Sequence, residues 1–272
     1  MGNKDLLILD GGIGKNICFS SCLSKLDKVN VMSSWSRLFK NHPNVNYSYD
    51  MIVTPLNDNI EFLSKFKNIQ FIEGYDSHFY LNKIHLINNY RKILNIEEKQ
   101  SIYNEIYFTE KEEEDIKPIL SKLENFVLVQ FVGSDEKYPE TDFIGSRSLI
   151  KKEAQEIINV LNFDLKLNVL NVYSSIDLFK NTAKVDIKLD YMNYAHLLKY
   201  AKGFVGIDSS LNHMSANRFC DTKGVVLWND ENVIERFSYN KNTNIISNTP
   251  RVMRFDVNEV IDNFEKIRRK ND

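Results

Sequence analysis

Three adjacent polar residues, Asp208, Ser209 and Ser210, directly follow an apolar stretch over 204–207 that predicts a buried strand. A carboxylate accepts hydrogen bonds from sugar hydroxyls. Serine hydroxyls, together with the backbone N–H groups at a helix start, can hold a phosphate. Ligands of open parallel sheets lie beyond the carboxyl ends of the strands. We therefore expect this turn to bind a sugar and a phosphate, although Ser209 also fits a simple helix N-cap.

His213 lies five residues after Asp208, near the first turn of a helix predicted over 211–219. This histidine either faces the same site or packs in the interior. A Ser–His–Asp hydrolase is disfavoured, because the sequence has no G-x-S-x-G turn. Asp208 and Ser209 are also adjacent, so they cannot serve separately as the histidine-orienting group and the nucleophile.

A second turn of interest reads Asp-Gly-Gly-Ile-Gly-Lys-Asn and follows the apolar run over 6–9. It opens a helix predicted over 15–26. Glycines let the backbone approach a ligand closely, and a helix start offers N–H donors. The turn predicts a ligand-binding loop, with a glycine turn used for packing alone as the alternative. Its members are Gly11, Gly12, Gly14, Lys15 and Asn16.

A phosphate-binding P-loop fits this turn poorly. The pattern G-x-x-x-x-G-K-[ST] requires glycine at position 9 and a hydroxyl at position 16, where the chain has Leu9 and Asn16. A deviant P-loop ATPase remains an alternative, with Asp10 in place of that loop's first lysine. ATP turnover that needs Mg²⁺ and Lys15 would support it.

Strands and helices alternate in two series, on either side of an acidic run at 110–115. This alternation predicts an α/β protein with two doubly wound parallel sheets. Strands are predicted over 6–9, 29–32, 51–54, 68–72, 126–132, 167–173, 204–207 and 225–228. Helices are predicted over 15–26, 60–66, 79–95, 151–161, 194–201, 211–219 and 256–269.

The composition bounds the class of protein. The chain has 272 residues and a net charge of -2, so no global basic field favours a nucleic-acid coat protein. Three cysteines do not form a disulfide framework, which favours a reducing cytoplasm. No run reaches the ~18 apolar residues of a membrane span. No acidic pair indicates a metal site, and no pattern indicates an oligomeric state.

Around these residues the chain resembles glycosyltransferase family 9, the ADP-heptose:lipopolysaccharide heptosyltransferases and their relatives. In that family a strand ends in Asp-Thr-Gly-x-x-His and leads into a helix of small residues. Here the corresponding run is Ile-Asp-Ser-Ser-Leu-Asn-His-Met-Ser-Ala over 207–216, followed by a strand over 224–228. The helix over 194–201 and the strand that ends at Gly133 also fit the family.

The resemblance implies a GT-B fold, in which two Rossmann-like, doubly wound domains face each other across a cleft. The domain over 1–122 would hold the acceptor, and the domain over 123–255 would hold a nucleotide-sugar. The helix within 256–272 would cross back to the first domain.

The resemblance also implies an inverting, metal-independent transfer of a hexosyl or heptosyl group to a hydroxyl acceptor. The donor would be a nucleotide-diphosphate-sugar, and no further cofactor would be required. The family has a carboxylate just after the loop glycine, where this chain has Lys15. Asp10 either supplies the missing carboxylate as general base or caps the loop.

On the donor side, Asp208 would bind the transferred sugar. Trp228 either borders the nucleotide-base pocket or packs in the core. Lys15 contacts an acidic acceptor or the leaving phosphate in this interpretation. Residues predicted to bind the donor's phosphates are Gly133, Ser134, Lys137, Ser209 and Ser210, and Lys137 also fits an ordinary solvated loop lysine.

The acceptor is not encoded in any motif. A surface saccharide fits the family, and a hydroxymethylated DNA base is an alternative acceptor for a phage-type enzyme. A non-catalytic nucleotide-sugar-binding protein is the rival from another class, and the lysine at position 15 favours it. A carboxylate within ~3 Å of an acceptor oxygen would separate these two interpretations.

Overall fold

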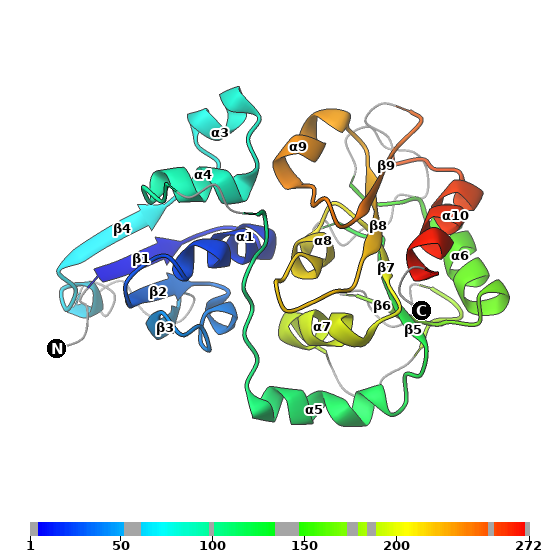
Figure 1. The fold of residues 1–272 in the computed structure, drawn as a ribbon, viewed down its shortest axis with the longest axis horizontal. Coiled ribbons are helices and arrows are strands. Elements are labelled where there is room, and N and C mark those ends of the chain that lie inside the picture. The colour runs from blue at the N-terminus through cyan, green and yellow to red at the C-terminus, as the bar shows by residue number, and fades with distance from the viewer. Residues whose placement is uncertain are drawn as a thin grey trace. The chain divides into compact units, whose positions relative to one another are not determined.

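The computed structural model describes residues 5–51, 61–97, 101–133, 147–172, 179–183, 189–249 and 253–269. The chain forms two compact units (Figure 1). Unit 1 comprises residues 1–109 together with 217–219, and unit 2 comprises residues 110–216 and 220–272. None of the helices in the described ranges is long and apolar enough to span a bilayer.

Unit 1 contains a four-stranded parallel sheet in the order β3-β2-β1-β4. Its strands are β1 (Asp5–Leu9), β2 (Val29–Ser33), β3 (Val45–Asp50) and β4 (Asn68–Ile72). Because the strands are parallel, all their carboxyl ends lie on one edge. Leu6 and Ile8 pack with Met32 against a cluster of aromatic rings, whereas Leu7 on the opposite face is also buried. Burial of both faces explains why β1 is continuously apolar.

The helices of unit 1 begin and end differently from the sequence prediction. The predicted helix over 79–95 is two helices, α3 (Ser77–Asn82) and α4 (Leu86–Ile93), because Lys83 adopts a left-handed conformation with φ 49°. The His85 side chain then caps α4 by accepting from the Ile87 N–H. Helix α4 packs against α1 (Ile13–Leu23), and a short 3-10 turn spans Ser36–Leu38.

The third strand is also displaced from its predicted position. The sequence analysis placed it over 51–54, whereas β3 ends at Asp50 and residues 52–54 lie outside the described ranges. Tyr47 and Tyr49 lie on alternate positions of β3, and their rings stack 6.1 Å apart. The polar residues between the tyrosines hide this edge strand from a search for continuous apolar runs.

Unit 2 contains a five-stranded parallel sheet in the order β6-β5-β7-β8-β9. Its strands are β5 (Phe126–Gln130), β6 (Asn168–Asn171), β7 (Phe204–Ile207), β8 (Gly224–Trp228) and β9 (Thr243–Ile246). The edge strand β9 was not predicted, because its sequence Thr-Asn-Ile-Ile is half polar and lacks a clear period. Pairing with β8 defines it instead.

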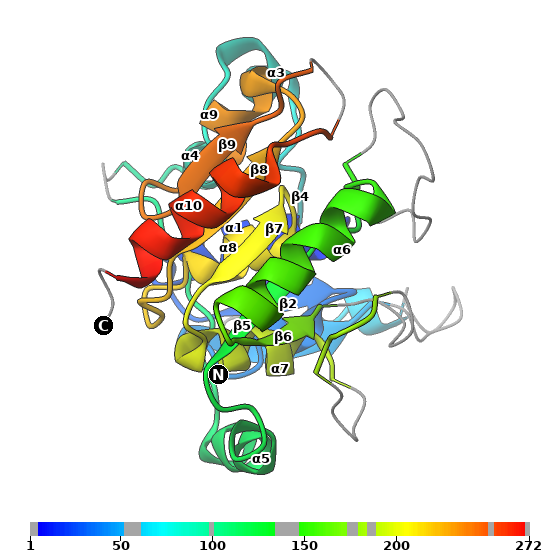
Figure 2. The same ribbon diagram turned by 90° about the vertical axis from the view of Figure 1, so that its right-hand side faces the viewer.

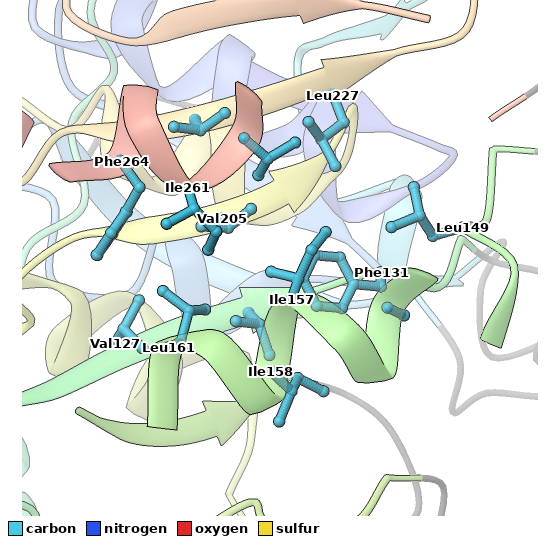
Figure 3. Close-up of a cluster of buried hydrophobic side chains, with 14 of the residues drawn as sticks. Val127, Phe131, Leu149, Ile157, Ile158, Leu161, Val205, Leu227, Ile261 and Phe264 are labelled. Carbon is cyan, nitrogen blue, oxygen red and sulfur yellow. The ribbon is translucent and has the colours of Figure 1, made fainter. Parts of the chain in front are cut away.

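Two helices, α6 (Lys151–Asn159) and α10 (Val257–Arg268), cover one face of this sheet (Figures 2 and 3). Phe264 and Ile261 of α10 join Val127 and Val205 in one buried apolar cluster. The apolar side of α10 is thus buried within unit 2.

The remaining helices of unit 2 include one formed by the acidic run. Helix α5 (Glu110–Leu120) contains that run and packs beside α7 (Tyr191–Leu197) within unit 2. Its solvated glutamates and its buried Ile116 and Ile119 are typical of a surface helix. The shorter elements are η2 (Val160–Asp164), η3 (Leu198–Tyr200), α8 (Ser210–Ser215), η4 (Glu231–Val233) and α9 (Ile234–Phe237).

Candidate functional site

The first candidate site lies at the carboxyl end of β7 in unit 2. Asp208 is the first residue after this strand, and the described residues provide no hydrogen bond to its carboxylate. Burial raises the pKa of Asp208 from 3.8 to about 6, and the nearby Arg147 cation opposes that rise. Part of the residue's surface stays accessible although the carboxyl group lies deep in the unit. A desolvated carboxylate at a strand end is typical of a functional site.

Gln130, the last residue of β5, organises the turn beside Asp208. Its side-chain oxygen accepts hydrogen bonds from the Ser209 hydroxyl at 2.5 Å and from the Leu211 N–H at 3.2 Å. Ser209 is the N-cap of α8, but its side chain makes no capping bond. The hydroxyl is therefore fixed from the neighbouring strand, and Gln130 is a site residue that the sequence analysis missed. Its position at the end of an apolar strand was the available signal.

Arg147 is a second residue that the sequence analysis missed. Its charge acts on both Asp208 and His213. Gly133 lies beside it, since a Cβ atom built on this glycine would be 3.5 Å from Arg147 Cβ. The Gly133 N–H donates to Ser148 Oγ at 2.8 Å. A cation and a small-residue turn thus lie next to the desolvated carboxylate.

His213 packs in the interior of unit 2. Its Nδ1 lies 2.9 Å from the Tyr239 hydroxyl, and the Tyr239 and Phe237 rings meet it edge-on. Burial, aided by the Arg147 cation, lowers the pKa of His213 from 6.5 to about 4, so the imidazole is neutral at pH 7. A neutral imidazole can share a proton with Tyr239 without adding charge to the site.

Of the other residues predicted to bind the sugar-nucleotide donor, two are buried and two lie outside the residues that the structure describes. Trp228 is fully buried, and its Nε1 donates to Asn244 at 2.9 Å, so it has the core-packing role that the sequence left open. Ser210 is buried in the first turn of α8. Ser134 and Lys137 lie outside the described residues.

The second candidate site lies at the carboxyl ends of β1 and β4 in unit 1. Asp10 follows β1, is exposed, and accepts a hydrogen bond from the Gly11 N–H at 2.6 Å. The φ of 97° at Gly11 lies in the region that favours glycine. Gly12 is the N-cap of α1, and Gly14 lies in its first turn. Asp10 thus both shapes the loop and presents an accessible carboxylate.

Lys15 is held by a carboxylate that the sequence analysis missed. Its ammonium lies 2.7 Å and 3.0 Å from the two carboxylate oxygens of Glu73. Glu73 directly follows β4, the strand that pairs with β1. Sequence reasoning could have found it by inspecting the residue after each predicted strand, as it did for Asp10.

Asn16 is buried and fully used inside the loop. Its amide donates to Gly12 O at 3.1 Å, and its oxygen accepts from Ser33 Oγ at 2.6 Å. Trp35 braces the same loop by donating from Nε1 to Gly11 O at 2.9 Å. Asn16 has an amide where a P-loop has a magnesium-binding hydroxyl, and these bonds occupy that amide. Lys15 is paired with the Glu73 carboxylate. The ATPase alternative therefore finds no support in this loop.

The structure thus assembles each predicted turn within its own unit. In unit 2 it brings Asp208 and Ser209 together with Gly133. In unit 1 it brings Asp10 and the glycine turn together with Lys15. Within the described part of the chain, no group of three or more His, Cys, Asp or Glu residues could hold a metal ion.

The chain thus folds as two α/β units with wholly parallel sheets, an architecture that matches the GT-B class of fold. No family model matches the sequence, and no curated protein matches it. Solved structures do match. A glycosyl transferase of family 9 from Veillonella parvula aligns with a TM-score of 0.70 at 12% identity, over 99% of each chain.

Two Escherichia coli structures are also similar. ADP-heptose lps heptosyltransferase II aligns with a TM-score of 0.64 at 10% identity, over 98% of this chain and 99% of that one. Heptosyltransferase WaaC with ADP aligns with a TM-score of 0.61 at 9% identity, over 97% and 99%. The chain therefore has the fold of the family 9 glycosyltransferases, as its sequence resemblance predicted.

Proposed function

We propose that the protein is an inverting glycosyltransferase that moves a sugar from a nucleotide-diphosphate-sugar to a hydroxyl acceptor. The observation that carries the proposal is the desolvated Asp208, with its raised pKa, at the carboxyl end of β7 in this fold. Keeping a carboxylate without hydrogen bonds from the described residues costs free energy, and a bound ligand's hydroxyls would supply those bonds.

The donor side of the proposal rests on unit 2. Arg147 supplies a positive charge for a diphosphate, and Ser209 is held in place by Gln130. Gly133 presents no side chain beside them. Cationic and hydrogen-bonding groups can stabilise a diphosphate leaving group without a metal ion. In one structural neighbour, WaaC, the bound nucleotide is ADP.

The acceptor side of the proposal rests on unit 1, with Asp10 as general base. In the reaction, the acceptor O–H bond breaks and its proton passes to the Asp10 carboxylate. The acceptor oxygen forms a bond to the anomeric carbon, and the bond from that carbon to the diphosphate oxygen breaks. The bonding electron pair leaves with the nucleoside diphosphate. Asp10 is exposed and therefore accessible to a hydroxyl.

We propose a saccharide as the acceptor and the cytoplasm as the compartment of the reaction. Exposed carboxylates at Asp10 and Glu73 are suited to hydroxyl groups. They are unsuited to the phosphates of DNA, which proteins bind with Lys and Arg. We assign the acceptor to unit 1 and the donor to unit 2 for these reasons.

The test is a thermal-shift panel of ADP-, UDP-, GDP- and CMP-sugars and the free nucleotides. We expect one nucleotide class to raise the melting temperature of the wild-type chain and to lose most of that effect in Asp208→Ala. Asp262→Ala, an exposed change on α10, is the matched control and should respond like wild type. Stabilisation by ATP–Mg²⁺ with no response to any sugar nucleotide would contradict the proposal.

A further inference from the structure

The strand β4 of unit 1 leaves most of its side chains in solvent. Four of the five residues of Asn68–Ile72 are exposed, and Phe71 is 74% and Ile69 39% exposed. Ile69 pairs in register with Leu6, and Phe71 with Ile8. Side chains paired across neighbouring strands share a face of the sheet, and on this face Leu6 and Ile8 are buried. The apolar face of the sheet therefore continues onto β4, where it is exposed.

The outer backbone edge of β4 has no strand beside it in the described part of unit 1. β4 is the last strand of the order β3-β2-β1-β4, and it pairs in parallel with β1 (Figure 1). Among the described elements, β1 is also the one that packs extensively against β4. The N–H and C=O groups of alternate residues in β4 therefore point away from β1. Such an edge is a template for a further strand.

The sequence of β4 lacks the features that block pairing at an edge. Natural edge strands commonly carry a lysine, a proline or a bulge. The five residues of β4 read Asn-Ile-Gln-Phe-Ile, with no charge and no proline, and they pair with β1 in unbroken register. In contrast, a register shift between Val29 and Asn30 interrupts the pairing of β2 with the other edge strand, β3. Of the two edges of this sheet, β4 is the better suited to accept a strand.

The charges that flank β4 have opposite signs. Lys65 and Lys67 precede the strand and are exposed, and Glu73 directly follows it with 59% of its side chain exposed. Burial alone would raise the pKa of Glu73, but hydrogen bonds from Lys15 and from the Tyr75 N–H lower it, so Glu73 is ionised at pH 7. Two copies of this strand would oppose like charges in a parallel pair and opposite charges in an antiparallel pair.

We propose that β4 is a dimerisation strand, which pairs antiparallel with β4 of a second copy of this chain. Centring the pairing on Gln70 sets Ile69 opposite the partner's Phe71. The same register sets Lys67 opposite the partner's Glu73. Each contact occurs twice because the pair is related by a two-fold axis. Pairs of an aromatic with a β-branched residue, and pairs of opposite charges, stabilise antiparallel strands. The inference does not depend on the proposed function.

Sedimentation equilibrium of the full chain is the first test. One pair of five-residue strands makes a small interface, which belongs to the weak and transient class. We therefore expect a monomer–dimer equilibrium between micromolar and millimolar concentration. The average mass should rise toward twice the monomer mass and no further, because a two-fold contact closes on itself. A chain that stays monomeric over this range, or one that forms larger assemblies, would overturn the proposal.

A substitution in each edge strand separates this interface from any other. Phe71→Lys should lower the association constant by about tenfold, because two pairs of isoleucine with phenylalanine are lost in each dimer. Tyr47→Lys is the matched control, since Tyr47 is a 66% exposed aromatic residue on β3, the opposite edge. This control should associate like wild type. Association that is lost in Tyr47→Lys and kept in Phe71→Lys would assign the interface to β3 and overturn the proposal.

Charge reversal tests the register. Lys67→Glu and Glu73→Lys should each fail to self-associate, because each homodimer would oppose like charges at both ends. Mixed in equal amounts, the two variants should form a heterodimer, in which both ends have opposite charges. Lys65→Glu is the control for Lys67→Glu and should self-associate like wild type, because this register does not set Lys65 opposite Glu73. Two folded variants that stay monomeric when mixed would contradict the proposed register.

Amide hydrogen exchange tests the strand without any substitution, and it decides the matter if Glu73→Lys does not fold. The amides of residues 68–72 that point away from β1 should gain protection as the concentration of wild type rises. The amides of residues 45–50 in β3 should not change. A dimer that forms without added protection in β4 would show that its interface lies elsewhere.

Discussion

The two units place a carboxylate just after a central parallel strand, but in different environments. Asp10 in unit 1 is exposed and accepts a hydrogen bond from its own loop. Asp208 in unit 2 lies deep in its unit with a raised pKa near 6. The same topological position thus yields a solvated carboxylate in one unit and a desolvated one in the other.

The same position after a parallel strand can therefore serve ligand binding in one unit and acid–base chemistry in the other. A desolvated carboxylate gains most when a ligand supplies hydrogen bonds, so it is suited to binding. A solvated carboxylate is accessible to a bound hydroxyl, so it is suited to acid–base work.

Replacing the solvated carboxylate should abolish turnover and spare donor binding. We expect Asp10→Asn to lower the transfer rate by about 10²–10⁴-fold, because the acceptor proton loses its base. The thermal shift caused by the donor should not change. Asp27→Asn, an exposed change in the turn before β2, is the control with the same chemistry. Loss of donor binding in Asp10→Asn would contradict the assignment of the donor to unit 2 and of acceptor chemistry to unit 1.

Adding a methyl group at Gly74, next to Glu73 in unit 1, should destabilise the fold. A Cβ atom on Gly74 would be 2.5 Å from Tyr90 Cζ and 2.6 Å from its hydroxyl oxygen. We expect Gly74→Ala to lower the free energy of unfolding by about 2 kcal/mol, measured by urea denaturation. Gly12→Ala is the matched control, because nothing lies within 4 Å of a Cβ there. Equal stability of the two variants would show that Tyr90 does not hold the Glu73 segment.

Removing the desolvated charge should stabilise unit 2. The folded pKa of Asp208 is about 6 against an ordinary 3.8, so the folded chain binds the extra proton between these values. Stability from this group therefore falls as pH rises through that window. Asp208→Asn should unfold at higher urea than wild type at pH 7.5, by roughly 1 kcal/mol or more, with the gap closing near pH 4.

His213 also contributes to the pH dependence of stability. Its pKa is lowered to about 4, so its contribution to the free energy of unfolding rises with pH between about 4 and 6.5, opposite to that of Asp208. Both chains retain this histidine, so its contribution cancels in the difference between them. An Asp208→Asn chain that is less stable than wild type at every pH would contradict a desolvated carboxylate.

The smallest effect is expected at Ser209. Ser209→Ala removes the hydroxyl that donates to Gln130 at 2.5 Å. One hydrogen bond is worth about 1 kcal/mol, so we expect roughly threefold to tenfold weaker donor binding by calorimetry. Ser64→Ala on the surface of unit 1 is the control and should bind the donor like wild type. Unchanged binding in Ser209→Ala would show that this hydroxyl does not contribute to donor binding.

Much of the fold could be predicted because the signals are local. Continuous apolar runs placed β1 and β7 within a residue or less of their observed bounds, and β4 was predicted over its observed residues 68–72. Where the signal was not local, prediction was wrong. The break at Lys83 depends on a left-handed backbone, and β9 depends on its partner β8.

The candidate site divides in the same way. Asp10 and Asp208 were found because each directly follows an apolar run that predicts a strand. Arg147 was missed because its relevance depends on β7, which is distant in sequence. Glu73 directly follows a predicted strand, but its pairing with Lys15 of α1 could not be read from the sequence.

The alternation of strands and helices, the two turns and the family resemblance can all be read from the sequence, because side-chain periodicity and glycine placement act over a few residues. The environment of each side chain depends instead on how the folded chain packs. This packing desolvated Asp208, neutralised His213 against Tyr239, and paired Lys15 with a glutamate 58 residues away. Burial and charge proximity depend on which strands become neighbours, and neighbouring strands are set by the packing of the whole unit.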